Sequence, residues 1–341
     1  MKASRLAARL RREAPPHADA TAFARRPGRL TGVRRGPSGF AMTPLLAASR
    51  VPLIDGLGAV ADRYDAILCD VWGVLHNGRE AFPPASEALA AFRRRGGAVA
   101  LITNAPRPNP PIREQALRFG VSPDAFDTMV TSGDVAIDLL VERGEAPVYH
   151  LGPERDLALI DAAAARSGAR PRLAGIEEAT YVLCTGLFDD RAETPDDYAD
   201  RLKRMASRGL TMICANPDLV VQRGEKLIYC AGALAQAYEA LGGATVYTGK
   251  PHRAIYRAAL AAAAAVRGAP LDPGRVLAIG DALRTDILGA TAAGLDALFV
   301  TAGIHSEALH DEDLSVGDEA LQRLFADENA RPIAAIRMLA P

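Results

Sequence analysis

Four short polar stretches each follow an apolar run that is typical of a buried strand. They are Asp70-Val71-Trp72-Gly73, Thr103-Asn104, Gly249-Lys250-Pro251-His252 and Gly280-Asp281, the last with Asp286 five residues further on. A short apolar run that ends at a turn signal predicts a strand of a covered sheet. Open α/β sheets bind their ligands at the carboxyl ends of the strands, which is where we expect these polar groups.

Together, these residue types are suited to phosphoryl chemistry. The carboxylates of Asp70, Asp281 and Asp286 are hard oxygen ligands of the kind that Mg²⁺ prefers. Thr103 and nearby amides can hold phosphate oxygens, and Lys250 can neutralise charge on the phosphate and on the nucleophile. Asp70 itself can attack phosphorus, since carboxylates form aspartyl-phosphate intermediates.

Strands and helices alternate along the chain, which predicts an α/β fold with a parallel sheet covered on both faces. A helical lead-in is expected over 52–64. The predicted strands cover residues 66–71, 98–103, 127–131, 148–151, 181–186, 211–215, 245–248, 276–279 and 297–300. The predicted helices cover residues 84–95, 112–119, 135–141, a segment that ends at 165, 195–207, 233–241, 254–266 and 285–293.

The middle of the chain restarts this alternation, so we expect one α/β unit inserted into another. The predicted core covers residues 42–145 and 249–341, and the inserted unit covers residues 146–248. Residues 1–41 hold ten Lys or Arg against two acidic residues and have no sustained apolar period, which predicts a disordered basic extension. That extension is either an organelle-targeting arm or the result of an over-long start, with Met42 as the first residue.

The four motifs, in this order, resemble those of the haloacid dehalogenase (HAD) superfamily. The resemblance covers about residues 50–305 and is strongest to the class IIA phosphatases, the NagD-like and pyridoxal- or glycerol-phosphatase-like group. The turn Asn216-Pro217-Asp218 and the stretch Gly232-Ala233 resemble those of class IIA caps. The resemblance implies a Rossmann-like HAD core with an inserted α/β cap of the C2 type, which closes over the substrate and selects it.

The resemblance also implies roles for individual residues. Asp70 would be the nucleophile, Thr103 and Lys250 would bind phosphate, Asp281 would bind Mg²⁺, and Asp286 would assist at the metal.

One position departs from the family pattern. The first motif of the family has a second Asp two residues after the nucleophile, and this chain has Trp72 there. That Asp protonates the leaving group and later activates water, which an indole does not do, although the backbone carbonyl of Trp72 can still ligate the metal. Loss of a general acid or base costs about 10²–10⁴ in rate.

Three interpretations of Trp72 stay open: a degraded site that only binds, an enzyme that needs a good leaving group, or an indole that stacks on the substrate. His76 and His252 are candidate substitutes for the missing acid/base, although a surface or packing role is the better interpretation of each taken alone. Asn104 and Asp218 are expected to contact the substrate together with Thr103, Lys250 and Trp72. Asp218 also suits a structural turn.

Two functions follow. The first is a Mg²⁺-dependent hydrolase, a phosphatase that cleaves a small phosphate monoester through an aspartyl-phosphate. The second is a catalytically impaired HAD-fold protein that binds a phosphorylated metabolite or a protein partner. Retention of the Asp, Thr and Lys positions favours the enzyme, whereas Trp72 favours the binding protein. A receiver domain, which uses similar residues, does not account for the inserted unit or for the late pair Asp281 and Asp286.

The composition of the chain is that of a soluble globular protein, with 49% hydrophobic and 24% charged residues. The formal net charge of −1 points neither to nucleic acid nor to an anionic membrane surface. The four cysteines lie far apart within or beside apolar stretches, which predicts reduced, buried thiols and a cytoplasmic location. The expected partners are a small phosphorylated metabolite and a second copy of the chain, in a homodimer formed through the cap.

Overall fold

The structure is a computed structural model that describes residues 50–223, 226–304, 309, 318–328 and 330–341. Residues 51–341 form one compact unit. The predicted basic extension, residues 1–41, lies outside the described residues.

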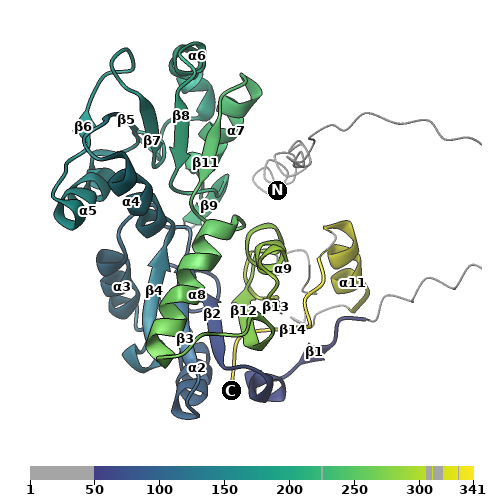
Figure 1. Cartoon of the computed structure of the whole chain (residues 1–341). Helices are drawn as coiled ribbons and strands as arrows, with labels where there is room; N and C mark the ends of the chain where they lie inside the picture. The colour runs from purple at the N-terminus through teal and green to yellow at the C-terminus, as the bar shows by residue number, and fades with distance from the viewer. Residues whose placement is uncertain (1–49, 224–225, 305–308, 310–317, 329) are drawn as a thin grey trace, which may run out of the picture. The chain divides into compact units, whose positions relative to one another are not determined.

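A seven-stranded parallel sheet forms the core (Figure 1). Its strand order is β1 (Leu53–Ile54), β14 (Ala334–Ile336), β13 (Asp296–Val300), β12 (Val276–Gly280), β2 (Ala66–Asp70), β3 (Ala98–Thr103) and β4 (Thr128–Thr131). Every strand pair in it is parallel. The chain therefore leaves each strand at the same edge of the sheet, where Asp70 and Thr103 lie.

Helices cover both faces of this sheet, and its central strands β2 and β12 are therefore buried along their whole length. Successive residues of β2 point to opposite faces, so Ile67 packs into one apolar cluster and Leu68 into the other. The first cluster is covered by α2 (Pro83–Arg94) and α3 (Asn109–Arg118). The second is covered by α8 (Arg253–Arg267), α9 (Leu288–Ala293) and α11 (Asp318–Asp327).

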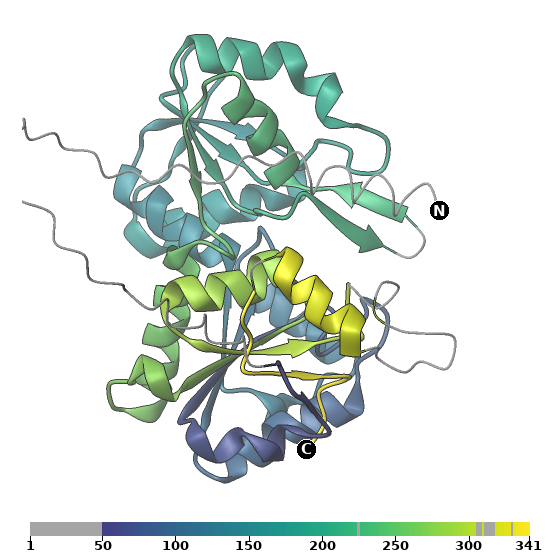
Figure 2. The ribbon, with the colours of Figure 1, turned by 90° about the vertical axis from the view of Figure 1, so that its right-hand side faces the viewer.

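A second parallel sheet has the strand order β11 (Thr245–Tyr247), β8 (Thr211–Cys214), β7 (Tyr181–Cys184), β5 (Pro147–Leu151) and β6 (Arg172–Leu173). On one face lie α6 (Ala199–Ser207) and α7 (Ala231–Ala240), and on the other α4 (Ser132–Arg143) and α5 (Ala158–Ser167). An antiparallel hairpin, β9 (Val220–Arg223) and β10 (Lys226–Tyr229), follows β8. This sheet and its helices form the upper part of Figure 2, and the core sheet forms the lower part.

The predicted α/β class with a parallel sheet is confirmed. The helix expected over 52–64 is wrong, because this segment forms β1 and two 3-10 helices, η1 (Leu57–Ala59) and η2 (Ala61–Arg63). The strands β1, β6 and β14 and the hairpin escaped prediction, since strands of two to four residues depend on pairing rather than on local pattern. The division into core and cap at residues 146 and 248 stays a prediction, and α4, which precedes residue 146, packs into the apolar cluster of the second sheet.

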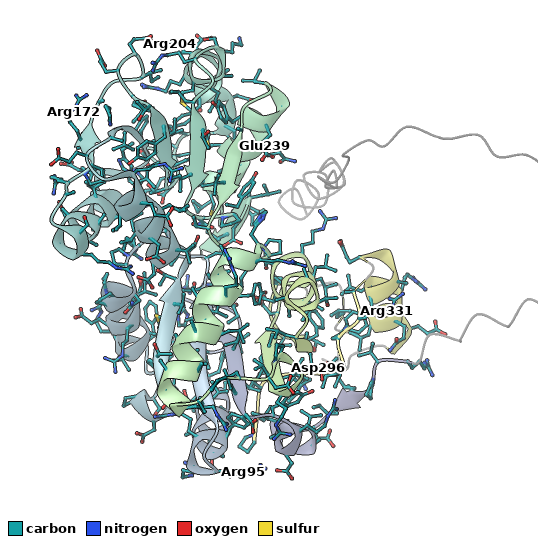
Figure 3. All side chains as sticks on the ribbon, in the orientation of Figure 1. Arg95, Arg172, Arg204, Glu239, Asp296 and Arg331 are labelled. Atoms are coloured by element: carbon teal, nitrogen blue, oxygen red, sulfur yellow. The ribbon has the colours of Figure 1, made fainter. Side chains whose placement is uncertain are left out.

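Arg172, Arg204 and Glu239 lie exposed on the second sheet and its helices, as Figure 3 shows. All four cysteines are buried thiols, as predicted. Within the described residues, no helix has the length and apolar character needed to span a membrane.

Candidate active site

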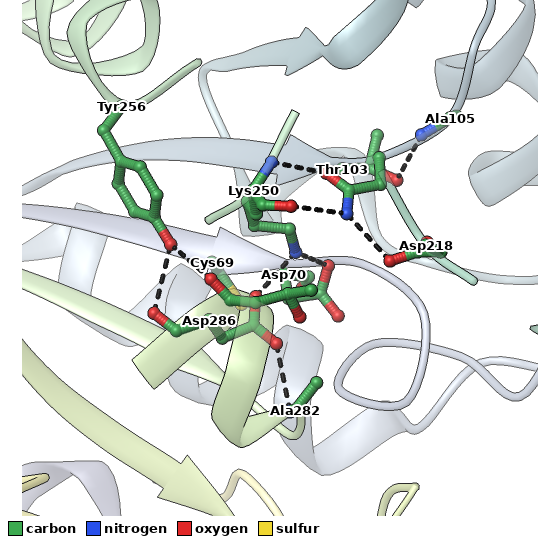
Figure 4. Close-up of polar contacts among 11 residues, drawn as sticks. Cys69, Asp70, Thr103, Ala105, Asp218, Lys250, Tyr256, Ala282 and Asp286 are labelled. Atoms are coloured by element: carbon green, nitrogen blue, oxygen red, sulfur yellow. Dashed lines mark hydrogen bonds and ion pairs between the residues drawn. The ribbon is translucent and has the colours of Figure 1, made fainter. Parts of the chain in front are cut away.

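Lys250 joins two carboxylates at the carboxyl edge of the core sheet (Figure 4). Its Nζ lies 2.5 Å from Oδ1 of Asp70 and 2.6 Å from Oδ1 of Asp286. All three side chains are at most 9% exposed. Asp70 ends β2, whereas Lys250 comes after β11 of the second sheet and just before α8. The chain therefore brings this lysine to the nucleophile candidate as it returns to the core.

Asp281 completes a cluster of three carboxylates. One oxygen each of Asp70, Asp281 and Asp286 lie within 4.8 Å of one another, and all three residues are buried. The backbone N–H of Ile304 donates to Oδ2 of Asp281 at 2.7 Å. Gly73, at φ +83°, leaves space for this side chain, since a Cβ there would lie 2.2 Å from the same oxygen.

The cluster holds more negative charge than Lys250 balances. Burial raises the pKa of Asp70 to about 7, with Lys250 opposing the shift and Asp286 adding to it. Burial, and then the charges of Asp70 and Asp286, raise the pKa of Asp281 well above its usual value. For Lys250, burial acts to lower the pKa, but Asp286 and Asp70 raise it well above the usual value. Three buried carboxylates beside one ammonium fit a divalent cation bound by hard oxygen ligands.

An irregular turn positions Asp286. It belongs to η7 (Leu283–Ile287), one turn of π-helix that follows β12. The backbone N–H of Ala282 donates to Oδ2 of Asp286 at 3.1 Å. The hydroxyl of Tyr256, on α8, donates to the carbonyls of Asp286 and Thr285 at 3.0 and 3.1 Å. π-helical turns are frequent at functional sites. The sequence gives no sign of this role for Tyr256, because a tyrosine within an apolar helix face is typical of a core residue.

Asn104 links the site to the second sheet. Its Oδ1 accepts from the backbone N–H of Lys250 at 2.7 Å, and its Nδ2 donates to the Lys250 carbonyl at 3.1 Å. The same Nδ2 donates to Oδ1 of Asp218 at 2.8 Å. Asp218 in turn lies in the turn after β8, where its N–H donates to Oδ1 of Asn216 at 3.0 Å. Asn104 and Asp218, both predicted substrate contacts, are thus hydrogen-bonded to each other across the two sheets.

Thr103 and Trp72 line a cavity of about 430 Å³ beside this cluster, together with Asn104, Asp218 and His76. The Oγ1 of Thr103 accepts from the backbone N–H of Ala105 at 3.3 Å. A Cβ added at Gly78 would lie 3.1 Å from Nε1 of Trp72, so the indole packs against the loop that follows β2. The volume suits a small ligand, since small-molecule sites span about 300–1,000 Å³.

The two histidines weighed as substitute acid/base groups differ in position. His76 lines the cavity with Trp72, accepts at Nδ1 from the N–H of Gly78 at 3.1 Å, and packs edge-on against Phe119. The neutral ring therefore carries its proton on Nε2. His252 stacks on Tyr247 with ring centroids 4.5 Å apart and is not among the residues that line this cavity. Of the two, the geometry favours His76.

Comparisons with known proteins identify the family of the chain. Residues 67–165 match the family of haloacid dehalogenase-like hydrolases, and residues 247–324 match a HAD-hydrolase-like family. A haloacid dehalogenase-like hydrolase from Brucella suis has 45% sequence identity, with a TM-score of 0.73 over 84% of this chain and 100% of that one. The chain therefore belongs to the haloacid dehalogenase-like hydrolases.

Two further relatives place the chain within that family. The ribonucleotide monophosphatase NagD of Escherichia coli is 28% identical over 70% of this chain and 88% of its own length. A glycerol phosphate phosphatase from Mycobacterium tuberculosis, solved in complex with calcium, is 25% identical, with a TM-score of 0.56 over 77% of each chain. The chain is a NagD-like, class IIA member of the family, as the sequence motifs predicted.

Proposed function

We propose that this protein is a Mg²⁺-dependent phosphatase that hydrolyses a small phosphate monoester through an aspartyl-phosphate on Asp70. The observation that carries the proposal is the buried ion pair between Asp70 and Lys250 inside a cluster of three carboxylates. The named relatives are phosphatases, which supports the enzyme over the catalytically impaired binding protein.

Each residue has a distinct task in the proposed reaction. Asp70 attacks phosphorus, the bond to the ester oxygen breaks, and water then hydrolyses the acyl phosphate to release inorganic phosphate and restore the carboxylate. Lys250 orients Asp70 and stabilises negative charge on the phosphoryl oxygens, which Thr103 also contacts. Asp286 holds Lys250 in place.

The metal would be held by Asp70, Asp281 and the backbone carbonyl of Trp72, with Asp286 beside it. When bound, Mg²⁺ would supply positive charge that offsets the negative charge of the phosphoryl group and of the attacking carboxylate. The mycobacterial relative was solved in complex with calcium, which supports binding of a divalent ion by a protein of this fold.

Trp72 makes the rate depend on the leaving group. Without a carboxyl group at this position, the departing alkoxide takes its proton from water or from Nε2 of His76. The expected Brønsted dependence on leaving-group pKa is therefore steep, and aryl phosphates are expected to react faster than alkyl phosphates.

The test is turnover of p-nitrophenyl phosphate and of alkyl phosphates with Mg²⁺, comparing wild type with Asp70→Asn. The matched control is Asp200→Asn, which removes an exposed carboxylate from α6. Turnover that Asp70→Asn abolishes and Asp200→Asn retains is the expected result. Equal turnover by wild type and Asp70→Asn would overturn the proposal. Trp72→Asp then measures how far the missing acid limits the rate with alkyl phosphates.

A further inference from the structure

The proposed reaction gives no task to the buried hydroxyl of Tyr256 (Figure 4). Tyr256 is 1% exposed on α8, and its hydroxyl donates to the carbonyls of Asp286 and Thr285 at 3.0 and 3.1 Å. A phenylalanine would fill the same apolar site without a polar group that needs a partner. What the hydroxyl adds is a fixed position for the backbone that carries Asp286.

This backbone is a turn that its own hydrogen bonds hold less firmly than an α-helix. In η7, the N–H of Ile287 donates to the carbonyl of Ala282, five residues back, at 3.3 Å, and the N–H of Asp286 donates to the same carbonyl at 2.9 Å. In a regular α-helix, each carbonyl accepts from one N–H four residues further on. Contacts from α8 therefore matter more for this turn than they would for an α-helix.

The segment that leads into α8 holds Asp286 at two points. The Lys250 ammonium donates to the carboxylate at 2.6 Å, and six residues further on the Tyr256 hydroxyl donates to the main-chain carbonyl. The fit is close, because a Cβ added at Gly289 on α9 would lie 2.5 Å from this hydroxyl and 2.8 Å from Cα of Pro251. A shift of the turn relative to α8 would therefore also change the contact between Asp286 and Lys250.

Such a shift would reach the nucleophile through Lys250, whose Nζ also lies 2.5 Å from Oδ1 of Asp70. Attack on phosphorus requires the attacking and departing oxygens to lie roughly in line, and a misplacement of about 1 Å costs about 10²-fold in rate. Attraction between an ammonium and a phosphate falls only as the inverse of their distance. A small displacement of Lys250 would therefore impair the attack by Asp70 far more than it would impair binding of phosphate.

We propose that Tyr256 is a positioning residue of the reaction. Its hydroxyl fixes the π-helical turn, so that Asp286 holds Lys250, and Lys250 holds Asp70 in the orientation for attack on phosphorus. The inference rests on the proposed function, since it assigns a further residue to that same reaction. Tyr256 itself contacts no reacting atom.

The test is Tyr256→Phe, which removes only the hydroxyl. Its matched control is Tyr238→Phe on α7, because Tyr238 is also fully buried and donates its hydroxyl to a backbone carbonyl, that of Leu210. Both variants are expected to lower the midpoint of urea denaturation, since each leaves a buried carbonyl without its donor. With p-nitrophenyl phosphate and Mg²⁺, kcat/KM is expected to fall at least tenfold in Tyr256→Phe and less than twofold in Tyr238→Phe.

Orthovanadate and inorganic phosphate separate orientation from binding. Vanadate accepts the attacking oxygen as a fifth ligand and so resembles phosphorus in the transition state, whose analogues report how the reacting groups are arranged. Calorimetry with Mg²⁺ is expected to show that Tyr256→Phe weakens vanadate binding at least tenfold and changes phosphate affinity less than threefold. An equal loss for both anions, or a loss for neither, would overturn the positioning role.

These measurements distinguish failure of this inference from failure of the proposed function. If the wild type hydrolyses p-nitrophenyl phosphate and Tyr256→Phe equals Tyr238→Phe in kcat/KM and in both affinities, the inference is overturned and the phosphatase stands. If the wild type binds vanadate but hydrolyses no ester, the phosphatase falls, and the vanadate affinity of Tyr256→Phe decides the positioning role. A wild type that neither hydrolyses an ester nor binds vanadate would overturn both.

Discussion

At the scale of single residues, Lys250 is the group on which the charge balance of the site depends. One ammonium, 3% exposed, contacts two buried carboxylates, Asp70 and Asp286. Removing one partner of a buried ion pair leaves an uncompensated charge, which destabilises a protein by about 3–5 kcal/mol. Lys250 therefore has a structural role in addition to its proposed contact with phosphate.

Lys250→Met is expected to abolish turnover and to lower the free energy of unfolding by about 3 kcal/mol or more. Urea denaturation without metal measures the second effect. Lys203→Met is the matched control, because this lysine is exposed on α6 and pairs only loosely with Asp200 at 3.7 Å. Equal midpoints for the two variants would contradict the structural role of Lys250.

Asp281→Asn is expected to stabilise the metal-free protein and to weaken metal binding. Burial and two neighbouring carboxylates raise the pKa of Asp281, so its ionisation opposes folding, and the amide removes that cost. Metal binding to the folded state stabilises it by RT ln(1 + [L]/Kd), so wild type should melt at a higher temperature with Mg²⁺. In Asp281→Asn, this increase of the melting temperature with Mg²⁺ should largely vanish. If Mg²⁺ raised the melting temperature of Asp281→Asn as much as that of wild type, Asp281 would be excluded as a metal ligand.

At the scale of elements, the turn after β2 sets the position of Asp281. Gly73 has φ +83° and lies against Asp281, whereas Gly96 has φ +87° with nothing within 4 Å of an added Cβ. Gly96→Ala therefore measures the cost of the backbone conformation alone, about 1 kcal/mol. Gly73→Ala carries the same backbone cost and, in addition, displaces the side chain of Asp281, a candidate metal ligand.

We expect Gly96→Ala to lose about 1 kcal/mol of stability and to keep wild-type kcat. Gly73→Ala should lose more stability and most of its Mg²⁺-dependent turnover, because an added Cβ would lie 2.2 Å from a carboxylate oxygen of Asp281. Thermal melts and kcat at saturating Mg²⁺ check both variants. If the two alanine variants kept equal kcat, displacement of Asp281 would not matter to the reaction.

Elements with a strong local pattern were predictable from the sequence. The long apolar strand β2 and its terminal Asp70 were placed correctly, because a buried strand followed by glycine leaves few alternatives. The sequence also put Lys250 at the end of a strand, but its ion pairs with Asp70 and Asp286 depend on how two sheets meet. Tyr256 carried no signal at all, since its contacts with the backbone of Thr285 and Asp286 depend on how α8 packs against the π-helical turn.

At the scale of the whole molecule, half-buried His150 couples stability to pH. Burial lowers its pKa to about 4, so between pH 6.5 and 4 the unfolded chain binds more protons than the folded one. Stability from this group is therefore present above pH 6.5 and lost as the pH falls toward 4. A fall in pKa from 6.5 to about 4 corresponds to about 3 kcal/mol.

His150→Gln keeps a polar group near the Thr185 hydroxyl, which lies 3.1 Å from Nε2 of His150, but does not titrate. Between pH 7 and 4, the free energy of unfolding of this variant should fall by about 3 kcal/mol less than that of wild type. Urea denaturation at several pH values gives both curves. Parallel curves would show that protonation of His150 does not oppose folding.

The expected homodimer through the cap stays a prediction, and β11 is the surface on which to test it. This strand is at one edge of the second sheet, and its Val246 is 39% exposed. Edge strands with exposed apolar side chains pair readily with other chains. Sedimentation should therefore show a dimer that Val246→Glu weakens. The control is Val266→Glu, which replaces a valine of similar exposure (44%) on α8. A monomeric wild type would refute the dimer.

The pairing of β1 with β14 has a consequence for synthesis on the ribosome. Leu53 and Ile54 lie beside Ala335 and Ile336, and the N–H of Leu57 donates to the carbonyl of Ala340 at 2.8 Å. The first strand of the core sheet can therefore pair only after the last one has been synthesised, because nearly the whole described chain lies between them. Until β14 emerges, β13 has an open edge in the nascent protein, which exposes it to pairing with other chains. Chaperone dependence is therefore expected to be greatest for chains stalled just short of β14.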